Sequence, residues 1–281
     1  MLNKIFRKSE KQLLKYLPQL FITEYGYNSD TLNVLTTPSY IYAKGNIPVL
    51  LVSHLDTVHK NLPKEIFHDT FKNVLWSPQG IGADDRAGVY AILQLITPKV
   101  KPYILFTTQE EVGGIGASIA AKELQAPEVK FIIEIDRKGS VDAVFYECKN
   151  KEFIVYITQF GFKENYGSFS DISVLCPEWN IAGVNLSTGY YNAHTKEEYL
   201  NLNQLNANIK KVKKIFNSIP EETFTYYLNN DDSYLYYEEE NFICENCCEE
   251  LPKMEESHID NLCYNCYRYL TIKEVNKSDY N

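Results

Sequence analysis

Acidic residues and histidines follow several apolar runs of this sequence, and these residue types can bind a metal ion. The apolar run at residues 49–52 continues into Ser53-His54-Leu55-Asp56, so a histidine and an aspartate come directly after a buried strand. Ligands of open α/β sheets gather at the carboxyl ends of parallel strands. We therefore expect His54 at the mouth of a site and Asp56 as the carboxylate that orients its imidazole ring.

Four more points of the chain deliver carboxylates or a histidine in a similar way. They are Asp84-Asp85 ahead of an apolar helix, Glu110-Glu111 after a strand at 103–108, Asp136 ending a strand at 131–136, and His194 in a late loop. Imidazole and carboxylate groups suit zinc, and a catalytic zinc site keeps one position open. Two ions roughly 3.5–4 Å apart would need one bridging carboxylate. As a structural alternative, the aspartate pair could simply favour a helix N-terminus.

Alternating strands and helices must position these residues. Leucines at helical spacing predict an opening helix over residues 1–20, and turn residues between apolar ones predict short edge strands over 25–44. Residues 57–80 resemble a polar loop, helices are expected behind Asp85 and over 115–124, and a closing helix over 202–215. Further strands are expected at 141–146 and 181–186, whereas 151–160 fits a helix or a strand. This βαβ pattern predicts an α/β fold with acids along one sheet edge.

Composition limits the classes of function. The chain has 281 residues, 44% of them hydrophobic and 23% charged, enough for one large domain and a small appendage. Its net charge of −9 argues against nucleic-acid binding, which needs clustered Lys and Arg. No apolar stretch is long enough to span a membrane, and the first ten residues do not resemble a secretory signal. We expect a cytoplasmic protein.

The cysteines predict a second, structural metal site. Cys244-x2-Cys247 and Cys263-x2-Cys266 are separated by residues 248–262, a spacing typical of zinc ribbons. Four thiolates would give a closed tetrahedral site that folds a small module. The module is surrounded by glutamates, so we expect it to serve protein contact or self-association rather than nucleic-acid binding.

Three segments follow from these patterns. Residues 1–220 form the expected catalytic domain, and residues 242–281 the zinc-ribbon-like module. Residues 221–241 hold seven acids and five tyrosines, which indicates an acidic linker or a strap packed on the main domain. His59 and His68 are interpreted as surface histidines, and the alternative is that they line the substrate cleft. Ser168, Ser170 and Asp171 lie in no nucleophile-elbow motif, which favours a helix cap or at most a substrate-pocket loop.

The motifs together resemble the co-catalytic di-zinc metallopeptidases. Their order is His54-x-Asp56, Gly82-Ala83-Asp84-Asp85-Arg86-Ala87-Gly88, Glu110-Glu111, Asp136 and His194. This superfamily includes tripeptide and glutamyl aminopeptidases, secreted leucine aminopeptidases, and carboxypeptidase G and aminoacylase relatives, and the resemblance covers residues 40–216. It implies a three-layer phosphorylase/hydrolase-like α/β fold with a mixed central sheet.

The resemblance also implies roles for single residues. His54 and Asp136 would bind the first metal ion, Glu111 and His194 the second, and Asp84 would bridge the two. Asp85 is the alternative for the bridge, since the adjacent pair leaves the register open by one residue. Asp56 would orient His54, and Glu110 would be the general base that takes a proton from a metal-bridging water. The implied cofactors are two catalytic Zn²⁺ ions, or Co²⁺ or Mn²⁺ in their place.

One departure from many relatives bears on specificity. Those relatives carry a dimerisation or lid domain between the counterparts of Asp136 and His194, where this chain has only residues 137–193. Relatives without the insertion are mostly aminopeptidases, so we expect an aminopeptidase-like exopeptidase acting on small peptides. The alternatives are an N-acyl amino acid deacylase or carboxypeptidase, and a catalytically silent module that binds through its zinc ribbon.

Overall fold

The computed structural model describes residues 1–28, 33–228 and four short strands nearer the C-terminus. The chain divides into two compact units, Met1–Leu228 and Asn229–Asn281. In the second unit two antiparallel pairs are described, β13 (Phe242–Ile243) with β14 (Glu250–Leu251) and β15 (His258–Ile259) with β16 (Leu262–Cys263). Among the described helices, none combines the length and apolar character that crossing a membrane requires.

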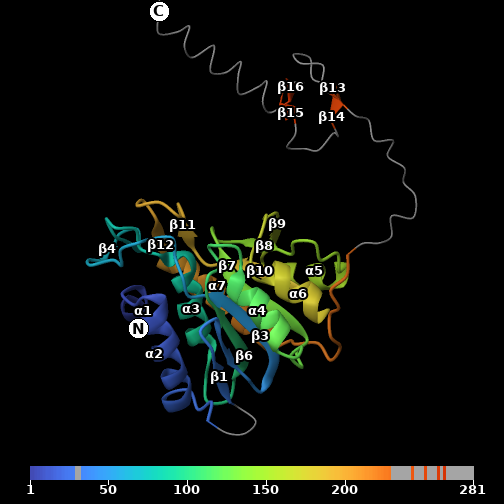
Figure 1. Ribbon diagram of the computed structural model, residues 1–281, viewed down its shortest axis with the longest axis horizontal. Coiled ribbons are helices and arrows are strands. Elements are labelled where there is room, and N and C mark those ends of the chain that lie inside the picture. The colour runs from blue at the N-terminus through green and yellow to red at the C-terminus, as the bar shows by residue number, and fades with distance from the viewer. Residues whose placement is uncertain (29–32, 229–241, 244–249, 252–257, 260–261, 264–281) are drawn as a thin grey trace, which may run out of the picture. The chain divides into compact units, whose positions relative to one another are not determined.

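An eight-stranded mixed sheet forms the centre of the first unit (Figure 1). Its strands, in spatial order, are β1 (Val34–Thr36), β2 (Tyr40–Ala43), β6 (Pro102–Thr107), β3 (Ile47–His54), β7 (Phe131–Arg137), β10 (Gly183–Ser187), β8 (Asp142–Val144) and β9 (Lys163–Asn165). The four central strands β6, β3, β7 and β10 run parallel, while β2 and β8 flank them in the antiparallel sense. The carboxyl ends of the central strands therefore meet at one edge.

Helices cover both faces of this sheet. One core contains side chains of α1 (Leu2–Phe6), α2 (Glu10–Thr23), α3 (Ala83–Leu95), α5 (Lys151–Thr158) and α7 (Leu202–Phe216), and the other contains side chains of α4 (Ile115–Glu123) and α6 (Ile172–Trp179). Alternate residues of β3 enter the two cores, Val49 and Leu51 on one side and Leu50 and Val52 on the other. The predicted α/β fold with a mixed central sheet is confirmed.

A second, four-stranded antiparallel sheet lies beside the main one and was not predicted. It consists of β11 (Tyr190–Tyr191), β12 (Tyr199–Asn201), β5 (Val74–Trp76) and β4 (Phe67–Asp69). Residues 57–80 thus contain two strands where the sequence indicated a loop. This sheet matters for the site because the segment that joins β11 to β12 carries His194.

The opening segment forms two helices instead of the single one expected. Helix α2 starts after Ser9, whose side-chain oxygen accepts a hydrogen bond from the backbone N–H of Gln12. In return the Gln12 side chain accepts a hydrogen bond from the backbone N–H of Ser9. This capping box gives α2 its own N-terminus and so separates it from α1.

Candidate metal centre

Parallel strands bring most of the predicted residues to one edge of the central sheet. His54 is the last residue of β3 and pairs in register with Thr107, the last residue of β6. Asp136 lies near the end of β7, on the other side of β3. Glu110 and Glu111 follow β6 in a turn, and Asp84 lies in the first turn of α3. Residues that are distant in sequence thus meet in one small volume.

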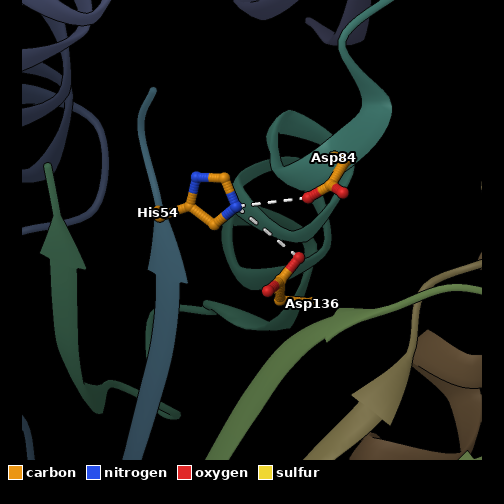
Figure 2. A group of neighbouring side chains, drawn as sticks. All are labelled: His54, Asp84 and Asp136. Atoms are coloured by element: carbon orange, nitrogen blue, oxygen red, sulfur yellow. Dashed lines mark hydrogen bonds and ion pairs between the residues drawn. The ribbon is translucent and has the colours of Figure 1, made fainter. Parts of the chain in front are cut away.

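The first group of potential metal ligands consists of His54, Asp84 and Asp136 (Figure 2). The Nε2 atom of His54 lies 3.2 Å from Oδ1 of Asp84 and 3.7 Å from Oδ1 of Asp136. Burial alone would lower the pKa of His54, yet the charge of Asp136 and the hydrogen bonds to neighbouring aspartates outweigh it and raise this pKa well above the ordinary value. One imidazole nitrogen and two carboxylate oxygens thus lie close enough together to bind the same ion.

The second group consists of Asp84, Glu111 and His194. The Nε2 atom of His194 lies 3.0 Å from Oε2 of Glu111 and 3.2 Å from Oδ2 of Asp84. The hydrogen bond to Asp84 and the charge of Glu111 raise the pKa of His194 to about 9. Unlike His54, which is fully buried, the His194 side chain is 54% exposed, so this group opens to solvent.

Asp84 belongs to both groups, and its two oxygens face different histidines. Its Oδ1 atom lies near His54 and its Oδ2 atom near His194. Asp85 points elsewhere, since its side chain accepts hydrogen bonds from Ser53 Oγ at 2.5 Å and from the Gly88 N–H at 3.1 Å. The peptide bond between the two aspartates is cis, and both have non-helical backbone angles within α3. Of the two adjacent aspartates, Asp84 is the one whose side chain lies between the two histidines.

Asp56 contacts three of the other predicted residues at once. Its Oδ1 atom lies 3.2 Å from Nδ1 of His54, on the ring nitrogen opposite the one that faces Asp84. Its two oxygens also accept hydrogen bonds, each 3.1 Å long, from the backbone N–H groups of Glu110 and Glu111. These hydrogen bonds stabilise the turn in which the two adjacent glutamates face the same site. The turn is entered through Gln109, which has a positive φ of 58°.

Glu110 lies beside the first group of potential ligands and is a member of neither group. Its Oε2 atom is 4.0 Å from Nε2 of His54, and its side chain is 13% exposed. Burial and the charges of the neighbouring carboxylates raise the pKa of Glu110, although the charge of His54 opposes them. A carboxylate with a raised pKa at the edge of a metal site is suited to accept and release a proton.

The residues present fit a pair of divalent ions. In each group the potential ligand atoms lie within 4.8 Å of one another, and each group offers three protein ligands, as catalytic zinc sites do. Burial first, and then repulsion among the carboxylates, raises the pKa values of Glu111 and Asp136. Moreover, the buried Oε1 atom of Glu111 has no hydrogen-bond partner among the described residues. Cations at these two points would relieve the repulsion and satisfy that oxygen.

A cleft of about 660 Å³ contains members of both groups. Tyr146, Phe169 and Tyr190 form apolar walls, and Arg137 and Lys138 supply positive charge along it. Its volume lies within the range of small-molecule sites, roughly 300–1,000 Å³. Another cavity, of about 760 Å³, lies on the small sheet and contains none of the six potential ligands and bases described above.

Several residues that shape the site had no signal in the sequence. Asn185 on β10 accepts a hydrogen bond from the Asp136 N–H at 2.9 Å, and the Tyr190 hydroxyl lies 3.3 Å from Oδ1 of the same aspartate. Glu198 is fully buried and binds the first turn of α3, which contains Asp84. His59, interpreted as a surface residue, instead has a side chain only 10% exposed that contacts Glu198, so that interpretation was wrong.

The cysteine-based prediction falls largely outside the described residues. Cys244, Cys247 and Cys266 are not among them, and Cys263 is described only as the backbone of β16. The predicted zinc ribbon therefore stays a prediction. Cys148 and Cys176, in the first unit, are buried free thiols.

Comparison with known proteins gives a family match over part of the chain and a set of similar folds. A family model described as M42 glutamyl aminopeptidase matches residues 74–150, a range that includes Asp84, Glu110, Glu111 and Asp136. No curated protein matches the sequence.

Solved structures with a similar fold include several peptidases. Aminopeptidase PepT from Bacillus cereus is 14% identical, with a TM-score of 0.59 over 76% of this chain and 96% of that one. A tripeptidase from Staphylococcus aureus is 15% identical, with a TM-score of 0.58 over 76% and 95%. The TET1 peptidase of Pyrococcus horikoshii, which can assemble into a tetrahedron or a large octahedral shell, is 14% identical, with a TM-score of 0.55 over 76% and 98%. At these identities the likeness concerns the fold.

Proposed function

We propose that this protein is a zinc-dependent, aminopeptidase-like exopeptidase. The observation that carries the proposal is the position of Asp84, whose two oxygens face histidines of two separate three-ligand groups. His54, Asp84 and Asp136 would hold one ion, and Asp84, Glu111 and His194 the other. The match to an aminopeptidase family over residues 74–150 supports the reaction class.

The chain's own residues would divide the work of amide hydrolysis. Divalent ions at this site would polarise the scissile carbonyl and lower the pKa of water to about 7. Glu110 would accept a proton from the attacking water and deliver it to the leaving amine, a role that typically contributes about 10²–10⁴-fold. Asp56 would hold His54 in one tautomer and keep Glu110 at the rim of the site.

The substitution Glu110→Gln tests this assignment. We expect the variant to bind zinc as the native chain does, because Glu110 belongs to neither ligand group, and to lose most of its turnover of aminoacyl peptides. Metal content measured by mass spectrometry and hydrolysis of an aminoacyl-peptide series give the two results. Glu178→Gln, which changes an exposed glutamate on α6, is the matched control.

The outcomes separate the candidate functions. Unchanged turnover in Glu110→Gln would overturn its role as the base. Cleavage of N-acyl amino acids or of C-terminal residues, with no action on aminoacyl peptides, would identify a deacylase or a carboxypeptidase instead. A native chain that binds no zinc pair and cleaves none of these substrates would be a silent binding module. Inhibition by a chelator, reversed by added zinc, is expected if the proposal is right.

We also propose that Cys244, Cys247, Cys263 and Cys266 hold a structural zinc ion, because the two Cys-x2-Cys pairs have zinc-ribbon spacing. A structural zinc site of this type would fold the C-terminal module, which would serve protein contact or self-association. Light scattering of the full chain, with and without a chelator, measures whether copies associate through it.

A further inference from the structure

A fully buried carboxylate, that of Glu198, binds the backbone on which Asp84 is carried. Its Oε1 atom accepts a hydrogen bond from the Asp84 N–H at 2.9 Å. Its Oε2 atom accepts one from the Gly82 N–H at 2.8 Å and lies 2.8 Å from Nε2 of His59. Both oxygens of this side chain are therefore used, and neither faces solvent.

The position of these donors explains why a carboxylate is buried there. Helix α3 has Gly82 as its N-cap residue, and glycine has no side chain that could bind the free N–H groups of the first turn. Glu198 supplies the missing acceptor from a segment more than a hundred residues away. A negative charge at a helix N-terminus is favourable, and hydrogen bonds to a charged acceptor are stronger than neutral ones. These contacts offset the cost of removing the carboxylate from water.

His59 completes the arrangement from the other side. Its ring packs against Gly80, where an added Cβ atom would lie 2.2 Å from the ring carbon Cε1. A side chain at Gly80, whose φ is +85°, would displace this ring, so the ring and the segment before α3 lie in close contact. The side chain of His59 is 10% exposed, and the ring nitrogen that faces Glu198 is Nε2.

The segment between β11 and β12 carries both Glu198 and His194. Residues 194–198 run from a member of the second ligand group to the residue that binds the Asp84 backbone. Because Asp84 is shared by both groups, a shift of its backbone would change the separation of the two potential metal sites. Glu198 is thus bonded to the backbone of Asp84 and joined to His194 by three intervening residues.

We propose that Glu198 is the positioning residue for Asp84, that it sets the geometry of the metal pair through the N–H groups of Gly82 and Asp84, and that His59 supports it. This inference rests on the proposed function. Glu198 would contact neither substrate nor metal. Its effect would pass through the backbone of the shared ligand.

The substitution Glu198→Gln in the full chain tests the proposal, and the quantity measured is its zinc affinity. Its amide NH₂ cannot accept from one of the N–H groups that Glu198 binds, so Asp84 would lose part of its support. We expect zinc binding at the pair to weaken by about 10–100-fold, the usual effect of losing such a partner. Affinity is measured by competition with a chelator, and thermal unfolding of the metal-free protein establishes that the variant is folded. Any cysteine-bound zinc is common to all variants and cancels in the comparison.

Glu197→Gln is the matched control, because it makes the same change at the adjacent, exposed residue. We expect its zinc affinity to equal that of the native chain. A folded Glu198→Gln variant with native zinc affinity would overturn the proposal and leave Glu198 as a residue of the fold only. A native chain that binds no zinc pair would instead overturn the proposed function.

A second pair of variants decides the matter if Glu198→Gln does not fold. His59→Ala removes one donor to Glu198, whereas His59→Gln keeps an N–H group at a similar distance from the backbone. We expect zinc affinity to fall in His59→Ala and to be restored in His59→Gln. Native affinity in His59→Ala would contradict the proposed support.

Discussion

The carboxylates of the centre differ in charge state because their surroundings differ. Hydrogen bonds to His194 and His54 lower the pKa of Asp84 in spite of its burial, so the carboxyl group that belongs to both potential ligand groups is ionised. Burial and repulsion among neighbours raise the pKa values of Glu110, Glu111 and Asp136. Without cations, the pKa values are therefore lowered at Asp84 and at Asp56, which bonds to His54, and raised at the other three carboxylates. Two divalent ions would favour ionisation of the whole set.

Zinc binding should become tighter as pH rises toward 9. In the metal-free protein the hydrogen bond to Asp84 raises the pKa of His194 to about 9, so this imidazole is protonated at neutral pH. A histidine that binds a metal must be neutral, and zinc must displace this proton. For each proton released, apparent affinity rises about tenfold per pH unit below the pKa. Lowering the pH should therefore weaken zinc binding.

Calorimetry in two buffers of different ionisation enthalpy measures this proton release directly. His68→Gln is a suitable control, because His68 is an exposed histidine that bonds only to Asn73 among the described residues and belongs to neither ligand group. Zinc affinity that stays constant between about pH 6 and pH 8 would contradict the assignment of His194 as a ligand.

The strands and helices that have a clear local pattern of apolar residues could be predicted from the sequence. The apolar runs that became β3, β6 and β7 each led into polar residues, and parallel pairing necessarily placed those ends together. The small sheet escaped prediction because β4 and β5 have three residues each and expose Phe67 and Trp76, so neither shows a buried pattern. The break between α1 and α2 could have been found, since Ser9 and Gln12 form a capping-box sequence.

Contacts of long sequence separation account for the rest of the site. Glu198 binds Gly82 and Asp84 across 116 and 114 positions, and no local pattern marks a glutamate that will bind a distant backbone. The same holds for the hydrogen bonds from the backbone of Glu110 and Glu111 to Asp56. These bonds span sequence separations of 54 and 55 positions. Residue types and their order were readable in the sequence. The partners that orient them required the fold.

Helix α3 approaches β7 closely at Gly88, and Gly88→Ala should weaken this contact. A Cβ atom at that position would lie 2.0 Å from the backbone oxygen of Ile135 and 2.4 Å from Oδ1 of Asp85. Because Ile135 precedes Asp136 and Asp85 follows Asp84, the clash falls next to two potential ligands. Overpacking of this kind costs about 1–3 kcal/mol of unfolding free energy.

Urea unfolding of the metal-free protein measures the cost, and a zinc titration measures the effect on the centre. Gln94→Ala, at a partly exposed position of the same helix, is the control and should leave both unchanged. We expect Gly88→Ala to lower the zinc affinity as well as the stability. Equal stability of the two variants would show that the helix can move away from β7 without loss.

At the scale of the molecule, the segment after α7 belongs to the first unit. Phe224 packs against Phe131, Phe153 and Tyr156, with ring centroids 5.1–6.2 Å apart. Its backbone N–H donates to the Lys130 carbonyl at 2.9 Å, and its carbonyl accepts from the Ala182 N–H at 2.8 Å. Phe224 is thus packed on the main fold, and the first unit ends at Leu228.

A fragment that ends at Leu228 should therefore retain the metal pair, because all five potential ligands and Phe224 lie within it. We expect about two zinc ions in this fragment and about three in the full chain, since four clustered cysteines would bind one more. Mass spectrometry of the purified proteins gives both counts. A full-length variant with Ser at positions 244, 247, 263 and 266 should match the fragment. Three ions in the fragment, or equal counts in fragment and full chain, would contradict the division into a hydrolytic unit and a separate zinc module.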